Sequence, residues 1–170
     1  SRSNYHVVLA GAVANQDGRS SSLTAPNGPA QNEVICDTIR VSGSSEPVTV
    51  LQLHGTGTML GDPIEMSAAL SALSSSQALT CSLVTGATKT MMGHSEPASG
   101  MASIFAASAS LQCAYTHSVS HLRTVNHNVA AVFIRGNNFI TVPRQVQSHV
   151  SCGIPVSKCA SVSAFAFQGT

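Results

Sequence analysis

Two short stretches each group residues whose types could carry out chemistry. In HGTGTMLGDPIE at 54–65, His54 ends the run VTVLQLH at 48–54 and precedes glycines and threonines. In KTMMGHSEPASG at 89–100, Lys89 lies just ahead of His94. Imidazole exchanges protons near neutral pH, and open α/β sheets place their sites just beyond the ends of buried strands. Both histidines are therefore candidates for catalysis, with a packing role as the alternative for His54.

The turn behind His54 has the composition of a ligand-binding loop. Gly55 and Gly57 have no side chain, so the backbone there can approach a ligand closely. The hydroxyl groups of Thr56 and Thr58 can hydrogen-bond such a ligand. The alternative is a tight turn whose threonines satisfy its own backbone.

Charge is scarce in this chain, which makes the few charged residues near these stretches informative. Charged residues are 9% of the sequence, against roughly 25% in an ordinary soluble domain. Glu65 is the carboxylate nearest to the first stretch, and an ion pair between Glu65 and Lys89 would account for both charges. A solvated lysine is the alternative for Lys89.

Three other patterns suggest chemistry but lack a required residue. GHSEP at 93–97 is similar to the nucleophile elbow G-x-S-x-G, which would make Ser95 a nucleophile, but Pro97 stands where the second glycine is needed. His117 and His121 are four residues apart without the glutamate of a zinc-binding H-E-x-x-H helix, and we assign no metal site. GATKT at 86–90 lacks the pattern of a phosphate-binding loop.

Strands and helices are expected to alternate along the chain and to position these stretches. Asp62 and Pro63 are expected to open the second helix, with the Asp62 side chain as its N-terminal cap. Strands and helices in this order predict an α/β layered fold with a largely parallel sheet. The expected strands are 5–12, 48–54, 80–86, one or two edge strands within 131–142, and the alternating end at 159–170; the expected helices are 29–40, 62–76 and 97–115.

Length and composition restrict the class of protein. The 170 residues fit one domain, and the net charge of +1 with scattered basic residues indicates no nucleic-acid partner. No apolar run reaches the length of a membrane span. The five cysteines, an odd number without a C-x-x-C pair, favour reduced thiols and a cytoplasmic location, with a plastid of an alga as the alternative. Because the chain lacks an initiator Met and a signal peptide, we expect it to be a piece of a longer protein.

Four stretches in this order resemble the β-ketoacyl synthase (ketosynthase) domain of modular type I polyketide synthases. They are NQDGRSSSLTAPNGPAQ at 15–31, HGTGTMLGDPIE, KTMMGHSEPASG and SAFAFQGT at 163–170, so the resemblance covers nearly the whole chain. It implies a thiolase-like layered α/β fold with a mixed, mostly parallel sheet and flanking helices. It also implies that residues 1–170 are only the C-terminal half of that domain.

The resemblance assigns roles to four residues of the first two stretches. His54 and His94 would be the two catalytic histidines. Lys89 would order the second histidine electrostatically, and Glu65 would be the acidic partner in that network. Neutral histidines that donate hydrogen bonds to a thioester oxygen would stabilise the enolate formed when a malonyl group loses CO2.

The resemblance also assigns substrate contacts and partners. Thr56 and Thr58 would hold the phosphopantetheine arm of an acyl carrier protein. The backbone N–H of Phe167 would help form an oxyanion hole, and its ring would gate the acyl pocket. The reaction is a decarboxylative Claisen condensation of an acyl chain with a malonyl-type extender, with no cofactor bound by the domain itself. The implied partners are acyl carrier protein, the N-terminal half of the ketosynthase, a neighbouring acyltransferase domain and a second copy of the ketosynthase in a homodimer.

The sequence departs from the family in two places. The nucleophilic cysteine of the family lies in a Cys-Ser-Ser context upstream of these stretches, and none of the five cysteines here has that setting. Ala166 and Gln168 replace smaller or glycine residues of the terminal turn. We therefore expect the chain alone to be inactive in condensation. Two alternatives remain open: a catalytically silent module that binds an acyl carrier or acyl chain, and a serine hydrolase that uses Ser95.

Overall fold

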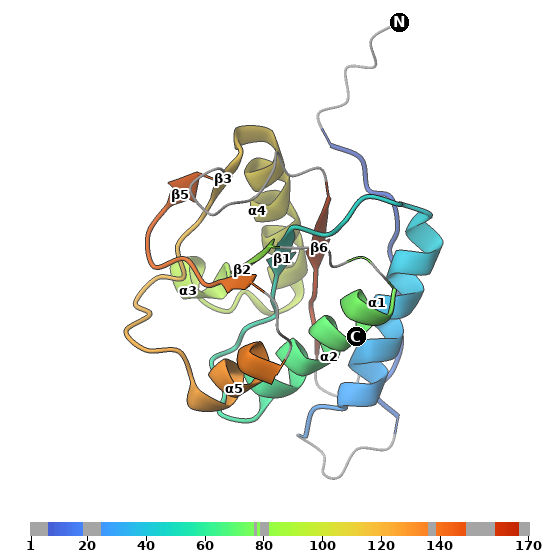
Figure 1. Cartoon of the computed structure of the whole chain (residues 1–170), viewed down its shortest axis with the longest axis horizontal. Coiled ribbons are helices and arrows are strands. Elements are labelled where there is room, and N and C mark those ends of the chain that lie inside the picture. Colours follow the sequence, from blue (N-terminus) through green and yellow to red (C-terminus); the bar gives the residue numbers. More distant parts are fainter. Residues whose placement is uncertain are drawn as a thin grey trace, which may run out of the picture.

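The computed structural model describes residues 7–18, 25–76, 78, 82–135, 139–148 and 159–166. Its centre is a four-stranded sheet of β1 (Val50–Gln52), β2 (Ser82–Gly86), β4 (Phe139–Thr141) and β6 (Ala160–Val162) (Figure 1). The strand order is β4-β2-β1-β6, and all three pairs are parallel. A separate two-stranded antiparallel sheet joins β3 (Tyr115–Thr116) to β5 (Gln147–Ser148). The expected parallel sheet is therefore confirmed.

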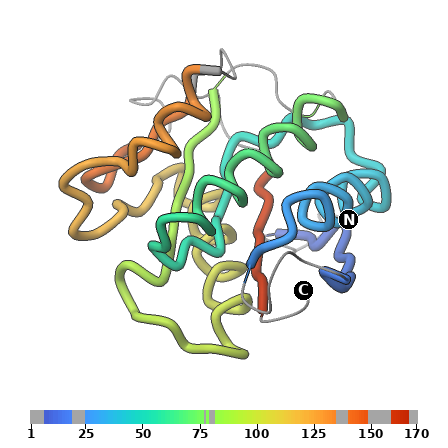
Figure 2. Tube along the Cα trace, turned by 90° about the horizontal axis from the view of Figure 1, so that it is seen from below, coloured from blue at the N-terminus to red at the C-terminus, as the bar shows by residue number. Residues whose placement is uncertain are grey.

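Helices cover both faces of the four-stranded sheet. α2 (Gly61–Ser75) packs between α1 (Gly28–Ser42) and α5 (His127–Arg135), and α4 (Ser99–Cys113) contacts β1 and β6 (Figures 1 and 2). Two short elements precede α4 in the chain, the single-turn helix α3 (Lys89–Met92) and the 3₁₀ turn η1 (Glu96–Ala98). The connections between parallel strands thus include helices, as parallel pairing requires.

The main hydrophobic core lies between the sheet and α1, α2 and α5. Leu51 of β1 and Leu83 of β2 point into it and are fully buried. Successive side chains of a strand point to opposite faces, so Val50 and Val84 lie on the other face and are also buried. Both faces of these strands are therefore covered, and each strand carries apolar side chains on both.

Helix α1 is confirmed and begins and ends as its sequence indicates. The side chain of Asn27 accepts a hydrogen bond from the N–H of Ala30, and Pro29 occupies the first turn. Gly43 ends the helix in the left-handed conformation, with φ of 59°. The expected strands at 48–54 and 80–86 and the expected helix at 97–115 are present with shorter bounds.

One expected element is wrong, and the expectation of edge strands within 131–142 is only partly confirmed. The described part of the 5–12 strand forms no strand, and Val8 and Leu9 are more than 70% exposed. No described strand pairs with it, and Gly11 lies instead against the end of α1, where a Cβ would come 2.9 Å from the nitrogen of Ser42. Residues 131–135 form the end of α5, because Val129 and Phe133 pack into the core at helical spacing. One edge strand, β4, does follow.

No helix in the described part of the chain is long and apolar enough to cross a membrane.

Candidate active site

The turn that carries His54 is fixed between neighbouring strands. The N–H of Leu53 donates to the carbonyl of Gly86, and the N–H of Ser163 donates to the carbonyl of Gln52, both at 2.8 Å. Gly55 then adopts φ of +51°, where a Cβ would come 2.9 Å from the Cβ of Ala87. Only glycine fits this close approach, so the chain reverses directly behind His54.

Glu65 of α2 anchors the backbone of this turn. Its two carboxylate oxygens accept hydrogen bonds from the N–H of His54, at 2.6 Å, and from the N–H of Gly55, at 3.0 Å. The side chain is 3% exposed, and burial raises the pKa of this carboxyl to about 7. The expected ion pair between Glu65 and Lys89 is wrong, because the carboxylate binds these backbone N–H groups while the lysine nitrogen binds His54.

Asp62 and Thr58 brace the outer part of the turn. The carboxylate of Asp62 accepts a hydrogen bond from the N–H of Gly57 at 3.1 Å, and it lies inside the first turn of α2 instead of capping it. The expected cap is therefore wrong. Leu60 occupies the cap position and makes no side-chain cap bond, and the hydroxyl oxygen of Thr58 accepts from the N–H of Gly61, the first residue of α2, at 3.0 Å. The alternative assignment, threonines that satisfy their own backbone, thus applies to Thr58. Thr56 is exposed.

Lys89 lies directly against His54, and not against His94, the histidine that it was expected to order. Its Nζ donates to the carbonyl oxygen of His54 at 2.7 Å and lies 3.3 Å from the imidazole Nδ1. Burial lowers the pKa of Lys89, and the field of Glu65 opposes that shift. The lysine thus brings a positive charge to the Nδ1 side of the imidazole.

The surroundings of His54 keep its ring neutral and fix its tautomer. Burial, followed by the fields of Lys89 and His94, lowers the pKa of His54 to about 4. Nδ1 accepts a hydrogen bond from the N–H of Phe165 at 3.2 Å, so that nitrogen carries no proton. In a neutral imidazole the other nitrogen, Nε2, must then carry it. His54 is consequently a hydrogen-bond donor through Nε2.

His94 has the same polarity and lies beside His54. The N–H of Glu96 donates to Nδ1 of His94 at 3.0 Å, which leaves Nε2 as the N–H donor of a neutral ring. Glu96 adopts φ of 46°, a left-handed conformation that is unusual for a side-chain-bearing residue. The two imidazole rings meet edge to face with centroids 5.7 Å apart. The predicted pair of histidines is therefore brought together.

Phe165 is the residue of this site that the sequence did not reveal. In addition to its N–H bond, its ring lies 5.7 Å from the His54 ring, centroid to centroid. The stretch SAFAFQGT contains both Phe165 and Phe167, but the family resemblance assigned a role only to Phe167. Phe167 and Gln168 lie outside the described residues.

The residues of the other weak patterns take part in no comparable arrangement. Ser95 is exposed and lies between α3 and the turn η1, without the strand that a nucleophile elbow follows. His117 and His121 lie in the loop before α5 and not on a helix. Within the described residues, no group of three His, Cys, Asp or Glu side chains could hold a metal ion.

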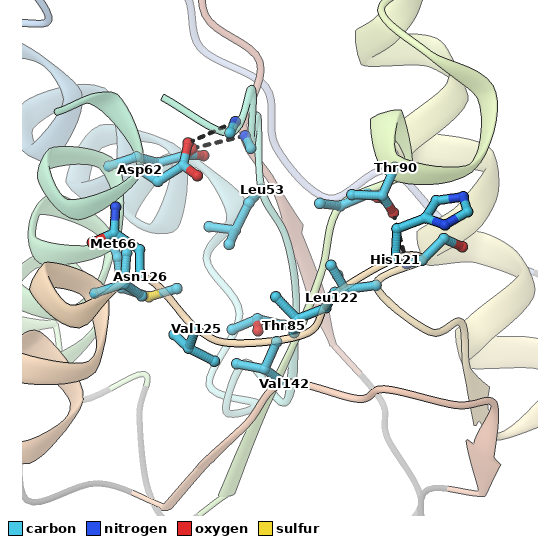
Figure 3. Close-up of a pocket in the computed structure, with 18 of the residues that line it drawn as sticks. Leu53, Asp62, Met66, Thr85, Thr90, His121, Leu122, Val125, Asn126 and Val142 are labelled. Carbon is cyan, nitrogen blue, oxygen red and sulfur yellow. Dashed lines mark hydrogen bonds between the residues drawn. The ribbon is translucent and has the colours of Figure 1, made fainter. Parts of the chain in front are cut away.

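A pocket of about 260 Å³ lies between α2, α5 and the loop that precedes α5 (Figure 3). Apolar side chains form most of its lining, including Leu53, Met66, Val125 and Val142. Glu65 and His121 contribute to the wall, but neither His54 nor His94 does. The pocket therefore adjoins the turn that carries His54 and is not the space in front of the two imidazoles.

Residues 6–123 match the family described as "Beta-ketoacyl synthase, C-terminal domain". The chain is 39% identical over 165 residues to a phenolphthiocerol/phthiocerol polyketide synthase of Mycobacterium tuberculosis, a match that covers 96% of the chain and 10% of that protein. It is 46% identical over 107 residues to polyketide synthase GfsA of Streptomyces halstedii, covering 59% and 1% respectively. The chain thus spans about a tenth or less of the length of these relatives.

The fold is similar to that of solved ketosynthases. The ketosynthase from module 1 of the bacillaene synthase of Bacillus amyloliquefaciens FZB42 matches with a TM-score of 0.81 at 27% identity, over 96% of this chain and 28% of that one. Ketosynthase twelve from the bacillaene polyketide synthase in Bacillus amyloliquefaciens matches with a TM-score of 0.77 at 26% identity, over 94% and 28%. These matches confirm the expected fold class, the C-terminal half of a thiolase-like layered α/β fold.

Proposed function

Because the chain belongs to the β-ketoacyl synthase family through its C-terminal domain, we propose that residues 1–170 are the C-terminal portion of a polyketide synthase ketosynthase. The observation that carries this proposal is the pairing of His54 and His94, each with Nδ1 occupied by a backbone N–H. The proposed reaction is the decarboxylative Claisen condensation of an acyl chain with a malonyl-type extender.

The two imidazoles suit the charge that develops in this reaction. When the bond between the α-carbon and the carboxylate of a malonyl thioester breaks, CO2 leaves and the electron pair remains as an enolate, whose negative charge lies largely on the thioester oxygen. The Nε2–H groups of His54 and His94 would both donate to that oxygen. The low pKa of His54, about 4, keeps its ring neutral, so it donates a hydrogen bond without transferring a proton.

Lys89 and Glu65 would act through His54. The ammonium group of Lys89 faces the Nδ1 side and favours the tautomer with the proton on Nε2. Glu65 binds the N–H groups of His54 and Gly55 and thereby fixes where the ring leaves the backbone. We therefore assign Lys89 and Glu65 as positioning residues and the two histidines as the groups that contact substrate.

The extender would arrive on the phosphopantetheine arm of an acyl carrier protein. Thr56 and Thr58 are exposed on the turn beside His54, and we propose that their hydroxyl groups hold this arm. Thr58 can do so while its oxygen accepts from Gly61, because its own proton remains free to donate. Phe167 is proposed to contribute an oxyanion N–H and to gate the acyl pocket.

The remaining half of the chemistry would come from outside residues 1–170. The enolate carbon attacks an acyl thioester on a cysteine, forms the carbon–carbon bond and expels the cysteine thiolate. We propose that this cysteine lies in the N-terminal half of the ketosynthase, which would also form the homodimer contact. A neighbouring acyltransferase domain would load the extender, and the ketosynthase itself would bind no cofactor.

Two steps test this function. The gene is first read upstream of Ser1, where a Cys-Ser-Ser region in frame is expected. The chain joined to that region is then supplied with acyl and malonyl carrier thioesters and should form a β-ketoacyl product, whereas residues 1–170 alone should not. Carrier binding without any product by the joined protein would instead favour the silent binding module.

A further inference from the structure

A buried pair of hydroxyl groups joins the lysine segment to helix α4. The Oγ1 of Thr88 lies 2.9 Å from the Oγ of Ser103, and either oxygen can donate. Thr88 is 3% exposed and Ser103 is fully buried. Water cannot replace a lost partner at such a depth, so removal of one hydroxyl leaves the other unsatisfied.

Thr88 is the residue from which α3 begins. Its carbonyl accepts hydrogen bonds from the N–H groups of Met91 and Met92, and Lys89 is its immediate neighbour. The Thr88 side chain does not cap α3, because its hydroxyl is bound to Ser103. A helix of four residues has no stability of its own. The direction of Lys89 therefore depends on contacts from outside α3.

Helix α4 also contacts the other partner of His54. Gly100, one turn before Ser103, lies so close to the end of β6 that a Cβ on it would come 3.3 Å from the Cβ of Ala164. Ala164 precedes Phe165, whose N–H binds Nδ1 of His54. Helix α4 thus contacts the residues next to both groups that approach Nδ1 of His54. Ser103 contacts Thr88, which precedes Lys89, and Gly100 packs against Ala164, which precedes Phe165.

We propose that Thr88 and Ser103 are positioning residues that hold the Lys89 ammonium against His54. The proposal takes its catalytic meaning from the function proposed above, but the geometry it describes can be measured without activity. A hydrogen bond has a preferred direction, so the hydroxyl pair fixes the orientation of α3 relative to α4. An apolar contact at the same place would pack α3 without fixing that orientation.

The test measures the pKa of His54 in the full chain by NMR titration of ¹³C-labelled imidazole rings. The His54 signal is identified by its absence in His54→Asn. Lys89 and His94 are the groups whose fields act on this ring, and Glu65 binds its backbone. Ser103→Ala should let Lys89 recede. A unit charge that moves from about 4 to about 6 Å at an effective dielectric of about 20 changes a pKa by about one unit. We expect an upward shift of about half to one unit, and no more than Lys89→Met produces.

Ser110→Ala is the matched control. Ser110 lies on the same helix, is 1% exposed, and its hydroxyl has no hydrogen-bond partner among the described residues. Its removal should leave the pKa of His54 unchanged. Equal shifts in Ser103→Ala and Ser110→Ala would overturn the proposal, because they would reflect a general loosening of α4.

Substitutions at Thr88 provide the second arm. Thr88→Ser keeps the hydroxyl and should retain the His54 pKa, whereas Thr88→Val should shift it upward as Ser103→Ala does. An unchanged pKa in both Thr88→Val and Ser103→Ala would also overturn the proposal. Neither result depends on condensation, so failure here is distinct from failure of the proposed ketosynthase function.

Discussion

The backbone N–H of Phe165 donates a hydrogen bond to Nδ1 of His54, a residue 111 positions earlier in the chain. The contact joins the end of β6 to the turn behind β1, and these two strands are neighbours in the sheet. Because an N–H can only donate, it requires a bare Nδ1 and leaves the proton on Nε2. The pairing of two parallel strands therefore determines which nitrogen of the histidine can act on a substrate.

Substitution of either histidine is expected to reduce condensation by the ketosynthase that includes this chain. Loss of one donor to a developing oxyanion typically costs about 10²–10³ in rate. We expect losses of this order for His54→Ala and His94→Ala, measured as β-ketoacyl product formed from carrier-bound malonate. If both donate to one oxygen, the double variant should lose less than the product of the single losses.

Ser95→Ala is the control for that measurement, because Ser95 lies beside His94 but is exposed. Its activity should remain close to the original, because the Ser95 hydroxyl has no part in the proposed hydrogen bonds to the thioester oxygen. A loss of activity as large as that of His94→Ala would favour the alternative of a serine hydrolase that uses Ser95.

Glu65→Gln is expected to change how stability depends on pH. The pKa of Glu65 is raised from 4.5 to about 7, so its contribution to the free energy of unfolding is present below pH 4.5 and is lost as pH rises toward about 7. The pKa of His54 is lowered from 6.5 to about 4, so its contribution is present above pH 6.5 and is lost as pH falls toward about 4. The two slopes oppose each other in the original protein.

In Glu65→Gln the opposing Glu65 slope is removed, and the His54 slope should make stability rise between about pH 4.5 and 6.5. Urea unfolding at several pH values in this range measures it. His54→Asn is the complement, since it leaves only the Glu65 slope and should lose stability as pH rises. Parallel curves for the two variants would contradict the assigned pKa directions.

Gly55→Ala is expected to destabilise the turn more than Gly57→Ala. Both glycines have positive φ, +51° and +76°, so alanine is strained at either position by about 1–2 kcal/mol. At Gly55 the new Cβ would also meet Ala87 at 2.9 Å, whereas at Gly57 nothing lies within 4 Å. Overpacking adds about 1–3 kcal/mol. Thermal unfolding of the two variants separates crowding from strain, and equal losses would exclude crowding against Ala87.

The sequence predicted the parts of this site that depend on local pattern. The apolar run before His54, the turn glycines and the helix after Pro29 each follow from short-range rules, and all are present. The Phe165 contact depends on strand pairing across most of the chain, which periodicity does not encode. The expected ion pair between Glu65 and Lys89 is wrong because it was inferred from charged side chains alone. Backbone N–H groups compete for a buried carboxylate, and those of His54 and Gly55 bind Glu65.

The misread segment at 131–135 has a similar cause. Val132 and Phe133 are β-branched and aromatic, which favours a strand locally, but they pack against the core from α5. So short an apolar run fits both the helical and the strand periodicity, and tertiary packing selects the helix here.

Self-association of the isolated chain is the last prediction. Along α4, Met101 and Phe105 lie one turn apart and are 52% and 68% exposed. Exposed apolar patches promote association, and with 9% charged residues and a net charge of +1 little electrostatic repulsion opposes it. We expect sedimentation velocity to detect oligomers whose fraction grows with protein concentration.

The double variant Met101→Gln/Phe105→Gln should lower that oligomer fraction, because it removes apolar area from one helix face without touching the buried face. Ile134→Gln is the matched control, since Ile134 is 80% exposed but lies on α5, on the other side of the sheet. If the two substitutions lowered association equally, general hydrophobicity and not the α4 face would drive it. A monodisperse monomer at every concentration would contradict the prediction altogether, and would mean that the exposed α4 side chains are tolerated in water.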